Sequence, residues 1–313
     1  MAGKLACIAV HAALTTFLLI ATSVISNNTT PIPADKSQLN TWFQNNVKPL
    51  SQRKTTLDLA LVAAEEGPPK VIRVSKNGGD FKTVSDAIKS IPTGNSKRVI
   101  VHIGPGVYIE KIRIERNQPF VTLFGSPNSM PTLTYDGTAL KYGTVDSASL
   151  VVESNYFTAA NLIIENSSLR PDGKRKGAQE NTELYVLGDA GLTVITAQAR
   201  EFDSEDYGYS FAHCRVTGTG NGTYLGRAWR SRPKVVFAYT TMSSVVNPAG
   251  WSDNFHPEFD STVFFGEYMC SGPGSNLAGR AKFTKHMNDA QVQPFVSLGF
   301  IQGSSWLLPP PNV

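Results

Sequence analysis

Two short stretches, Gly106-Val107-Tyr108-Ile109-Glu110 and Leu225-Gly226-Arg227-Ala228-Trp229, decide the fold expected for this 313-residue chain. Around both of them, short runs of β-forming residues recur, separated by Gly, Pro, Asn and Asp. Such runs are typical of strands joined by turns. They cover residues 98–103, 111–114, 121–124, 132–135, 149–152, 161–164, 193–196, 209–216, 235–240 and 262–268.

The pattern between these runs narrows the fold class to all-β. Long helical patterns do not intervene, which argues against a sheet of alternating strands and helices. Many short strands with turns suit either an antiparallel sandwich or a parallel β-helix, and periodicity alone leaves both open. The one helix expected in the body is short and runs from Ser85, as its cap, to a stop at Pro92.

The composition is that of a globular chain with a sizeable core, with 41% hydrophobic and 17% charged residues. Twenty-six glycines and 19 prolines indicate many turns, and no long charge-rich or low-complexity block indicates disorder. We expect one main domain over residues 71–313. Residues 27–70 form an extended leader with short amphipathic helices near Thr41 and over 57–64.

The first 26 residues have the pattern of a secretory signal peptide. Lys4 supplies the positive start, an apolar stretch without charge covers residues 5–24, and small residues follow at Ser23 and Ser26. The alternative is a membrane anchor, since the apolar run nears spanning length. Polar residues within the run favour cleavage. Sequons for N-glycosylation fit a secreted chain and begin at Asn27, Asn28, Asn166 and Asn221.

Charge, cysteines and histidines add weaker constraints. Cleavage after residue 26 removes one lysine and lowers the formal net charge from +4 to +3, which suits either a polyanionic partner or a plain solvated surface. Cys7 lies in the signal. Cys214 and Cys270 form either a disulfide or two thiols, with Cys214 in an apolar strand-like run. The five histidines show no metal-ligand spacing, so we expect no metal.

The two opening stretches match the G-x-Y-x-E and L-G-R-x-W motifs of plant pectinesterases (pectin methylesterases), and the chain resembles that family from roughly Val71 to Leu308. The resemblance implies a right-handed parallel β-helix that hydrolyses methyl esters of cell-wall homogalacturonan and releases methanol and pectate. It implies a secreted monomer in the plant cell wall that acts on pectin without a cofactor, and neither nucleic acid nor, after signal cleavage, a membrane is expected as partner. The leader resembles that of the short-leader subgroup, without an inhibitor-like pro-domain.

The resemblance breaks at one point, where Lys176-Gly177-Ala178-Gln179 runs straight into Glu180-Asn181-Thr182-Glu183. Between these segments the family carries Q-D-T and D-F-I-F-G segments. Each holds one catalytic aspartate; in the family one of the two aspartates attacks the ester, and the other acts as acid and later as base. Neither segment is present in this sequence. We predict a deletion of ~50 residues, or about two coils of the solenoid, for which an omitted exon is the natural hypothesis.

Four residues match family positions at the substrate. Thr144 matches a substrate-contact threonine, and Gln179 matches a glutamine that donates to the oxyanion, although the strand it opens is cut after its first residue. Arg227 matches the arginine that orients the nucleophile, and Trp229 the tryptophan that packs against the sugar. If the family resemblance is set aside, Arg227 can also be interpreted as an arginine of a surface turn, and Trp229 as a residue of the core. Other carboxylates considered as substitutes are Asp146, Asp189, Asp203, Asp206, Asp253 and Asp260.

Other matching residues are expected to serve structure. Gly106, Tyr108 and Glu110 are interpreted as a turn and the start of a strand, and Gly250-Trp251 as a packing segment. Three hypotheses for function follow: a pectinesterase by descent, a non-catalytic pectin-binding relative, and an aberrant splice or gene-model product. Because the nucleophile and the acid are both missing, we expect this chain to be inactive or nearly so.

Overall fold

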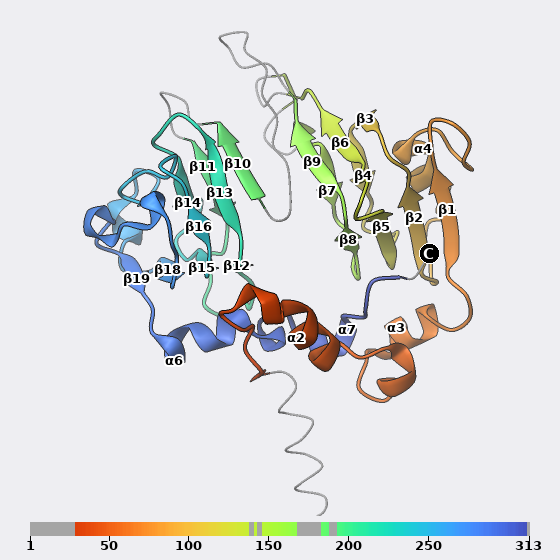
Figure 1. The fold of residues 1–313 in the computed structure, drawn as a ribbon, viewed down its shortest axis with the longest axis horizontal. Helices are drawn as coiled ribbons and strands as arrows, with labels where there is room; N and C mark the ends of the chain where they lie inside the picture. The colour runs from red at the N-terminus through yellow and green to blue at the C-terminus, as the bar shows by residue number, and fades with distance from the viewer. Residues whose placement is uncertain (1–28, 138–140, 143–145, 168–182, 188–192, 312–313) are drawn as a thin grey trace, which may run out of the picture. The chain divides into compact units, whose positions relative to one another are not determined.

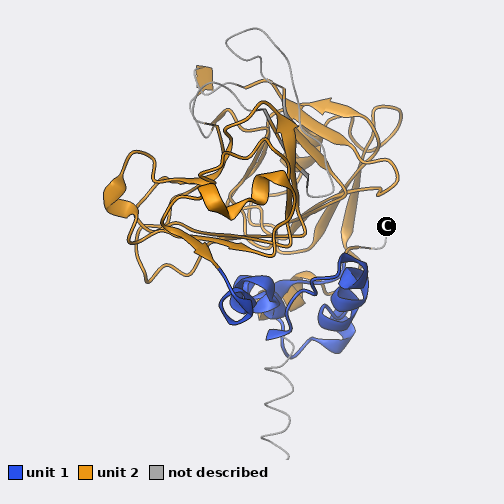
Figure 2. Cartoon of the chain, turned by 60° about the vertical axis from the view of Figure 1, so that its left-hand side comes forward, with its two compact units in different colours: residues 1–57, 287–309 blue, residues 58–286, 310–313 orange. Residues whose placement is uncertain are grey.

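A computed structural model describes residues 29–137, 141–142, 146–167, 183–187 and 193–311. The predicted signal peptide, Thr144, Gln179 and Asp189 lie outside these residues. The chain divides into two compact units, one formed by residues up to Leu57 with Met287–Pro309, and the other by Asp58–His286 with the last four residues (Figure 2). The boundaries predicted from the sequence at 26 and 70 stay a prediction.

The first unit is helical and ties the two ends of the described chain together. Ile32 donates a backbone hydrogen bond to the carbonyl of Val296 (2.6 Å). The buried Arg53 guanidinium donates to the carbonyls of Ser304 and Leu307. Its elements are η1 (Lys36–Gln38), α2 (Leu39–Asn46), η2 (Leu50–Gln52), α6 (Asp289–Val292), η6 (Gln293–Val296), η7 (Leu298–Ile301) and α7 (Gly303–Trp306).

The second unit is a parallel β-helix in which successive strands contribute to three sheets in turn (Figure 1). Every pairing between its described strands is parallel, which excludes the antiparallel sandwich and confirms the solenoid. Among the elements that the structure describes in full, α3 (Leu59–Ala64) precedes the strands and α4 (Val84–Lys89) lies between β1 and β2. Short 3₁₀ turns lie in its later loops, η3 (Pro257–Phe259), η4 (Pro273–Ser275) and η5 (Leu277–Gly279).

The strands form two stacks. The first stack has sheets β1-β2-β5-β8, β3-β6-β9 and β4-β7, and the second has β10-β13-β16, β11-β14-β17 and β12-β15-β18-β19. The first stack comprises β1 (Lys70–Val74), β2 (Val99–Ile103), β3 (Val107–Ile109), β4 (Ile112–Ile114), β5 (Val121–Gly125), β6 (Thr132–Tyr135), β7 (Leu150–Val152), β8 (Thr158–Ala160) and β9 (Ile163–Asn166). The second comprises β10 (Glu183–Leu187), β11 (Val194–Gln198), β12 (Tyr209–Ala212), β13 (Arg215–Thr219), β14 (Tyr224–Ala228), β15 (Lys234–Ala238), β16 (Thr241–Met242), β17 (Trp251–Ser252), β18 (Phe264–Tyr268) and β19 (Thr284–His286).

Within the residues that the structure describes, no strand ladder joins the first stack to the second. The buried side chains likewise form one cluster in each stack, the first from Ile72 to Leu133 and the second from Val216 to Phe265. Each stack therefore builds its own apolar interior, as expected where a coil contacts only its neighbours. The boundary between the stacks falls between β9 and β10, in the part of the sequence that contains the join at Gln179.

Like residues from successive coils stack inside each core. In the first stack Val101 pairs with Leu123 on the neighbouring strand, and both are fully buried. In the second stack the Phe211 and Phe237 rings on neighbouring strands of one sheet stack at 4.5 Å. The Trp251 ring of β17 stacks at the same distance on the Phe265 ring of β18, which belongs to a different sheet of the same stack. Stacked aromatic pairs add stabilisation of about 0.5–1.5 kcal/mol beyond the area they bury.

The corner that follows the third sheet uses left-handed backbone in each coil of the second stack. His213, Tyr239 and Met269 occupy equivalent positions with φ of 56°, 54° and 46°. This corner breaks the predicted run 209–216 into β12 and β13, because a strand cannot pass through a left-handed residue.

The residues after this corner explain why the two cysteines do not form a disulfide with each other. The carbonyl of Cys214 accepts from the amide of Thr241, and the carbonyl of Thr240 accepts from the amide of Ser271. Thr240 thus lies on the coil between the two cysteines. Two strand spacings of about 4.8 Å each exceed the separation of about 3.5–4.5 Å that a disulfide requires between Cβ atoms. The thiol alternative is therefore the one observed.

Helix α4 differs in one detail from its prediction. Its N-cap is Thr83, whose hydroxyl accepts from the amide of Asp86 (3.1 Å), and the proposed cap Ser85 lies inside the first turn. Threonine and serine are comparable caps, so the sequence alone did not separate them. In the residues described, no helix has both the length and the apolar character needed to cross a membrane.

Candidate functional site

Arg227 and Trp229 meet at the end of the central strand of a three-stranded sheet. Arg227 lies on β14, between Ala197 of β11 and Ser252 of β17, and Trp229 follows the end of that strand. The guanidinium carbon of Arg227 lies 4.7 Å from the centre of the Trp229 ring. The indole is 45% exposed. The pair offers solvent an aromatic face backed by a cation, a surface suited to packing against a sugar ring.

The hydrogen bonding of Arg227 is incomplete. Its Nη1 donates to Asn254 Oδ1 at 3.4 Å, while its Nε is buried without an acceptor. Among the described residues, no carboxylate forms an ion pair with this guanidinium. Leaving a buried N–H unsatisfied costs about 1–3 kcal/mol. Arg227 is therefore equipped to hold an acceptor such as a carboxylate.

The loop after β17 adds two residues that the sequence did not single out. Asn254 and Phe255 both have left-handed backbone, with φ of 62° and 64°. The Ser252 hydroxyl accepts from the amide of Asn254, and the Asp253 carboxylate accepts from the amide of Phe255, both at 3.0 Å. These bonds hold Phe255 with 85% of its surface exposed. An exposed aromatic ring on constrained backbone is a signal that only the structure reveals.

The G-x-Y-x-E residues are structural, as predicted. Tyr108 is 1% exposed, and its hydroxyl donates to the carbonyl of Gly104 (3.0 Å). The Glu110 carboxylate accepts from the amides of Val84 (3.0 Å) and Ser85 (2.7 Å). It therefore satisfies two of the free amides at the N-terminus of α4.

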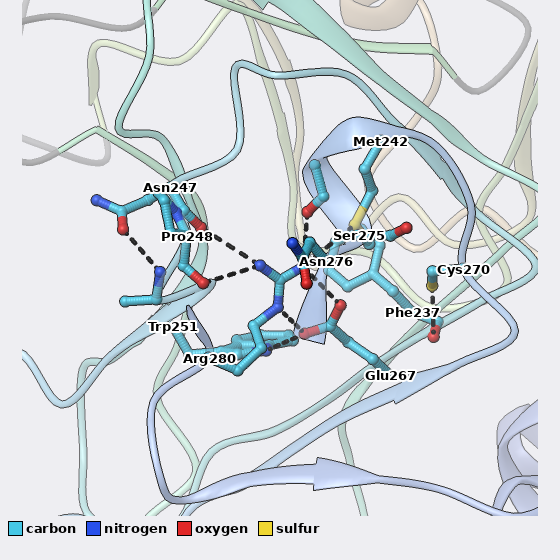
Figure 3. A network of polar contacts seen from close by, with 12 residues as sticks. Phe237, Met242, Asn247, Pro248, Trp251, Glu267, Cys270, Ser275, Asn276 and Arg280 are labelled. Atoms are coloured by element: carbon cyan, nitrogen blue, oxygen red, sulfur yellow. Dashed lines mark hydrogen bonds and ion pairs between the residues drawn. The ribbon is translucent and has the colours of Figure 1, made fainter. Parts of the chain in front are cut away.

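The packing role predicted for Trp251 is also confirmed. Its indole N–H donates to Glu267 Oε1 (3.0 Å), and the same oxygen accepts from Arg280 Nε (2.7 Å). Arg280 and Glu267 form an ion pair with side chains only 1% and 2% exposed (Figure 3). This pair is a part of the core and not a site for chemistry.

Comparison with known proteins identifies the family. A family model described as Pectinesterase matches residues 70–177 and 188–304. The chain belongs to the pectinesterase family. Its relatives include Pectinesterase 1 of Olea europaea, 44% identical over 362 residues that cover 98% of both chains. Pectinesterase of Parthenium hysterophorus is also 44% identical, with the same coverage.

Solved pectinesterases confirm the right-handed parallel β-helix. The pectin methylesterase from Aspergillus niger superposes with a TM-score of 0.58 at 21% identity, covering 78% of this chain and 98% of that one. The enzyme from carrot gives a TM-score of 0.56 at 20% identity, covering 79% of this chain and 98% of that one.

Two tyrosines that lie close to Thr144 in the sequence of this pectinesterase-family protein contact each other. The Tyr135 and Tyr142 rings lie 5.9 Å apart, and Lys141 Nζ lies 4.8 Å from the Tyr142 ring. A hydrogen bond with Tyr142 raises the pKa of Tyr135 to about 12, and a hydrogen bond from Lys141 lowers the pKa of Tyr142. Thr144 and Gln179 lie outside the described residues, so their place beside Arg227 stays a prediction.

Of the carboxylates considered as substitutes, three have other partners in the part of the chain that the structure describes. Asp146 lies 2.6 Å from Lys111 Nζ, whose hydrogen bond holds the pKa of that carboxyl below its usual range. Asp203 pairs with Arg232 (2.7 Å) and Arg200 (3.5 Å) on an exposed loop. Asp253 accepts from the amide of Phe255, and Asp206 and Asp260 are exposed. In the described part of the chain, no three His, Cys, Asp or Glu side chains gather as a metal site.

Proposed function

We propose that this protein is a secreted cell-wall member of the pectinesterase family that binds homogalacturonan but hydrolyses its methyl esters little or not at all. The observation that carries the proposal is Arg227, which stacks on Trp229 while its buried Nε lacks an acceptor. The guanidinium that orients the nucleophile in the family thus remains, and no described carboxylate pairs with it. Trp229, Arg227 and the predicted contacts Thr144 and Gln179 would hold the polysaccharide.

The lengths of the alignments support loss of the segment that carries both catalytic aspartates. The alignment with the olive relative extends over 362 positions, whereas 98% of this chain amounts to roughly 307 residues. Roughly 55 positions of that alignment therefore have no residue from this chain, close to the ~50 residues expected for two coils. The family model also breaks between residues 177 and 188, around the join at Gln179.

The strand order supports the same proposal. The coils β2-β3-β4 and β5-β6-β7 each supply three strands, whereas the coil opened by β8 and β9 has no third strand among the described residues. The next described strand, β10, pairs with β13 and starts the second stack. Among the described residues no ladder joins β9 to β10, so the solenoid is interrupted where the segment is missing from the family pattern. An isoform that lacks part of the wall around Arg227 is consistent with this interruption.

The test is methanol release from highly methylated pectin. The natural mature chain is compared with a version in which the coils missing from the family pattern are inserted between Gln179 and Glu180. We expect release from the restored version and a rate lower by on the order of 10⁴-fold or more from the natural chain, because nucleophile and acid are both absent. The restored version with Arg227→Ala is the matched control and should lose most of its activity. Comparable release from the natural chain would show that another carboxylate substitutes.

Measurements of pectin binding and of unfolding distinguish the proposed function from the hypothesis of an aberrant product that does not fold. The natural chain should be retarded in a gel that contains partly de-esterified pectin and should unfold cooperatively on heating. Retardation should weaken in the Trp229→Ala variant. A chain that neither binds pectin nor unfolds cooperatively would support the aberrant-product hypothesis.

A further inference from the structure

A pocket of about 530 Å³ lies at the corner between the first and second sheets of the second stack. Loops of three successive coils form it: the turn between β13 and β14, the loop between β16 and β17, and the loop after β18. Its volume is in the range of pockets that hold small ligands. The side chains that matter most are those of Asn221, Ser244, Asn247, Pro248, Pro273 and Asn276.

The pocket offers neutral hydrogen-bond donors. Asn247 Oδ1 accepts from the amide of Ala249 (2.9 Å), and Asn276 Oδ1 accepts from the amide of Ala278 (3.0 Å). These bonds fix both side-chain amides, and among the described residues neither Nδ2 has an acceptor. Two N–H₂ groups and the Ser244 hydroxyl are therefore available to a ligand rich in hydroxyl and carbonyl oxygens.

The pocket offers no free charge. Arg280 is the one charged side chain among its lining residues, and all five of its N–H donors have partners. Nε and Nη2 bind Glu267, Nη2 also donates to the carbonyl of Gly274, and Nη1 donates to the carbonyls of Asn247 and Pro248 (Figure 3). An acidic sugar would therefore find no counter-ion. A neutral sugar that carries an acetamide group would match the amides, and the rings of Pro248 and Pro273 would pack against its apolar face.

Asn221 lies at the rim of this pocket in a position to carry such a sugar. It is exposed, and its flanking residues Gly220 and Gly222 have φ of 78° and 92°, a turn that glycine adopts without strain. No hydrogen bond of the Asn221 side chain is found among the described residues. Asn221-Gly222-Thr223 is also an acceptor sequence for N-glycosylation.

We propose that Asn221 carries an N-linked glycan whose first N-acetylglucosamine occupies this pocket. In the transfer, Asn221 Nδ2 attacks C1 of an oligosaccharide linked to a polyprenyl diphosphate, the donor of the secretory pathway. The N–C1 bond forms, the C1–O bond breaks, the diphosphate leaves with the electron pair, and the amide loses one proton. The inference rests on the secretion included in the proposed function, because that donor is found only there.

Because Thr223 is buried in the folded protein, the glycan must be transferred to Asn221 before the next coil packs over this threonine. Thr223 is 0% exposed, and its amide donates to the carbonyl of Val245 on the next coil. A transferase that reads the threonine hydroxyl therefore needs the chain before β17 and its loop have packed. The sugar is then present when the loops of the three coils come together, and the pocket closes around it.

The modification is tested by secreting the chain from plant cells behind a heterologous signal peptide. Peptide mapping after treatment with peptide N-glycosidase should show conversion of Asn221 to aspartate. Asn221→Gln should abolish the signal, and Thr223→Ser, which keeps the acceptor sequence, should retain it. Chains that are retained inside the cell are mapped in the same way, because the glycan is added before secretion. An unmodified Asn221 in both pools overturns the proposal.

The place of the sugar is tested by the rate at which the glycosidase acts on the native protein. A seated sugar should be released at least about tenfold more slowly from native than from denatured chains, since two net hydrogen bonds amount to roughly 1.4 kcal/mol. Asn247→Asp and Asn276→Asp keep the oxygens that cap the loops and remove the N–H₂ donors, so release should accelerate. Equal rates of sugar release from native and denatured chains would show that the sugar does not occupy the pocket. None of these measurements uses pectin or methanol, so a failure here is distinct from a failure of the proposed function.

Discussion

The guanidinium carbon of Arg227 lies 4.7 Å from the centre of the Trp229 ring, while the Nε of the same guanidinium is buried without an acceptor. The guanidinium of Arg227 thus makes a cation–π contact with the indole, while its Nε–H has no hydrogen-bond acceptor. This arrangement separates two functions that an active pectinesterase combines. In the proposed function Trp229 keeps the contact with the sugar, whereas Arg227 has no carboxylate to orient among the described residues.

Removal of the Trp229 ring should weaken binding of pectin by the natural chain. A sugar ring that covers about 40–80 Å² of the indole removes that apolar area from water, which contributes about 1–2 kcal/mol, so Trp229→Ala should raise the dissociation constant for methylated oligogalacturonides by roughly 5- to 30-fold. Isothermal titration calorimetry measures the change. Phe202→Ala is the matched control, because Phe202 is also an exposed aromatic residue (60%) but lies on the acidic loop before β12. An equal loss in both variants would mean that Trp229 does not form the binding surface.

Much of the fold followed from the sequence because the family motifs mark structural positions. Tyr108 packs in the core of the first stack, Glu110 caps α4, and Trp251 fills the core of the second stack. Such residues are fixed by packing and by backbone geometry, and a motif identifies them without knowledge of distant contacts. The choice of a parallel solenoid over a sandwich rested on the resemblance, since both have short strands with period two.

The parts that sequence did not predict depend on contacts between coils. The left-handed conformation of His213, which ends β12, is set by the corner that it shares with Tyr239 of the next coil, and nothing in the local pattern marks it. The exposure of Phe255 depends on side-chain bonds from Ser252 and Asp253. The sequence also gave no indication that the strand ladders of the two stacks remain separate in the described residues.

Loss of the Glu110 carboxylate should destabilise the fold without affecting the binding of pectin. Glu110→Ala leaves the amides of Val84 and Ser85 without their acceptors, and loss of a helix cap costs about 0.5–2 kcal/mol. Urea unfolding followed by circular dichroism measures this change in the free energy of unfolding. Glu153→Ala is the control, since its carboxylate pairs with Arg113 at the surface (2.9 Å) and such pairs contribute about 0–1 kcal/mol. A larger loss in the control would contradict the capping role.

The Cys270 thiol should resist alkylation at pH values where ordinary thiols react. Burial is the main cause that raises its pKa to about 12, so the reactive thiolate is absent near pH 8.5, where a free cysteine is half ionised. Iodoacetamide labelling followed by mass spectrometry should modify Cys270 in the unfolded chain and spare it in the native chain.

The same shift in pKa predicts how stability changes with pH. Below about pH 8.5 the thiol is protonated in both states, and its contribution to stability is complete. As the pH rises towards about 12, the unfolded chain releases the proton and the folded chain keeps it, so the free energy of unfolding falls. Cys270→Ala should flatten this decline in chemical denaturation at alkaline pH. An unchanged slope would show that other groups cause it.

Breaking the Arg280–Glu267 pair should destabilise the second stack more than any surface pair. Arg280→Met leaves the Glu267 carboxylate buried without its cation, a change that costs about 3–5 kcal/mol. Arg113→Met is the matched control, because Arg113 holds Glu115 and Glu153 at the surface and should cost at most about 1 kcal/mol.

The double variant Arg280→Met/Glu267→Gln separates the cost of the unpaired Glu267 charge from the cost of the lost Arg280 hydrogen bonds. Its glutamine is neutral and keeps an oxygen for the indole N–H of Trp251, which donates to Glu267 Oε1 in the natural chain. It should therefore be more stable than Arg280→Met alone, as measured by the melting temperature. If the double variant is as unstable as the single one, the loss comes from the hydrogen bonds of Arg280 to the loop carbonyls of Pro248 and Gly274 and not from the unpaired charge.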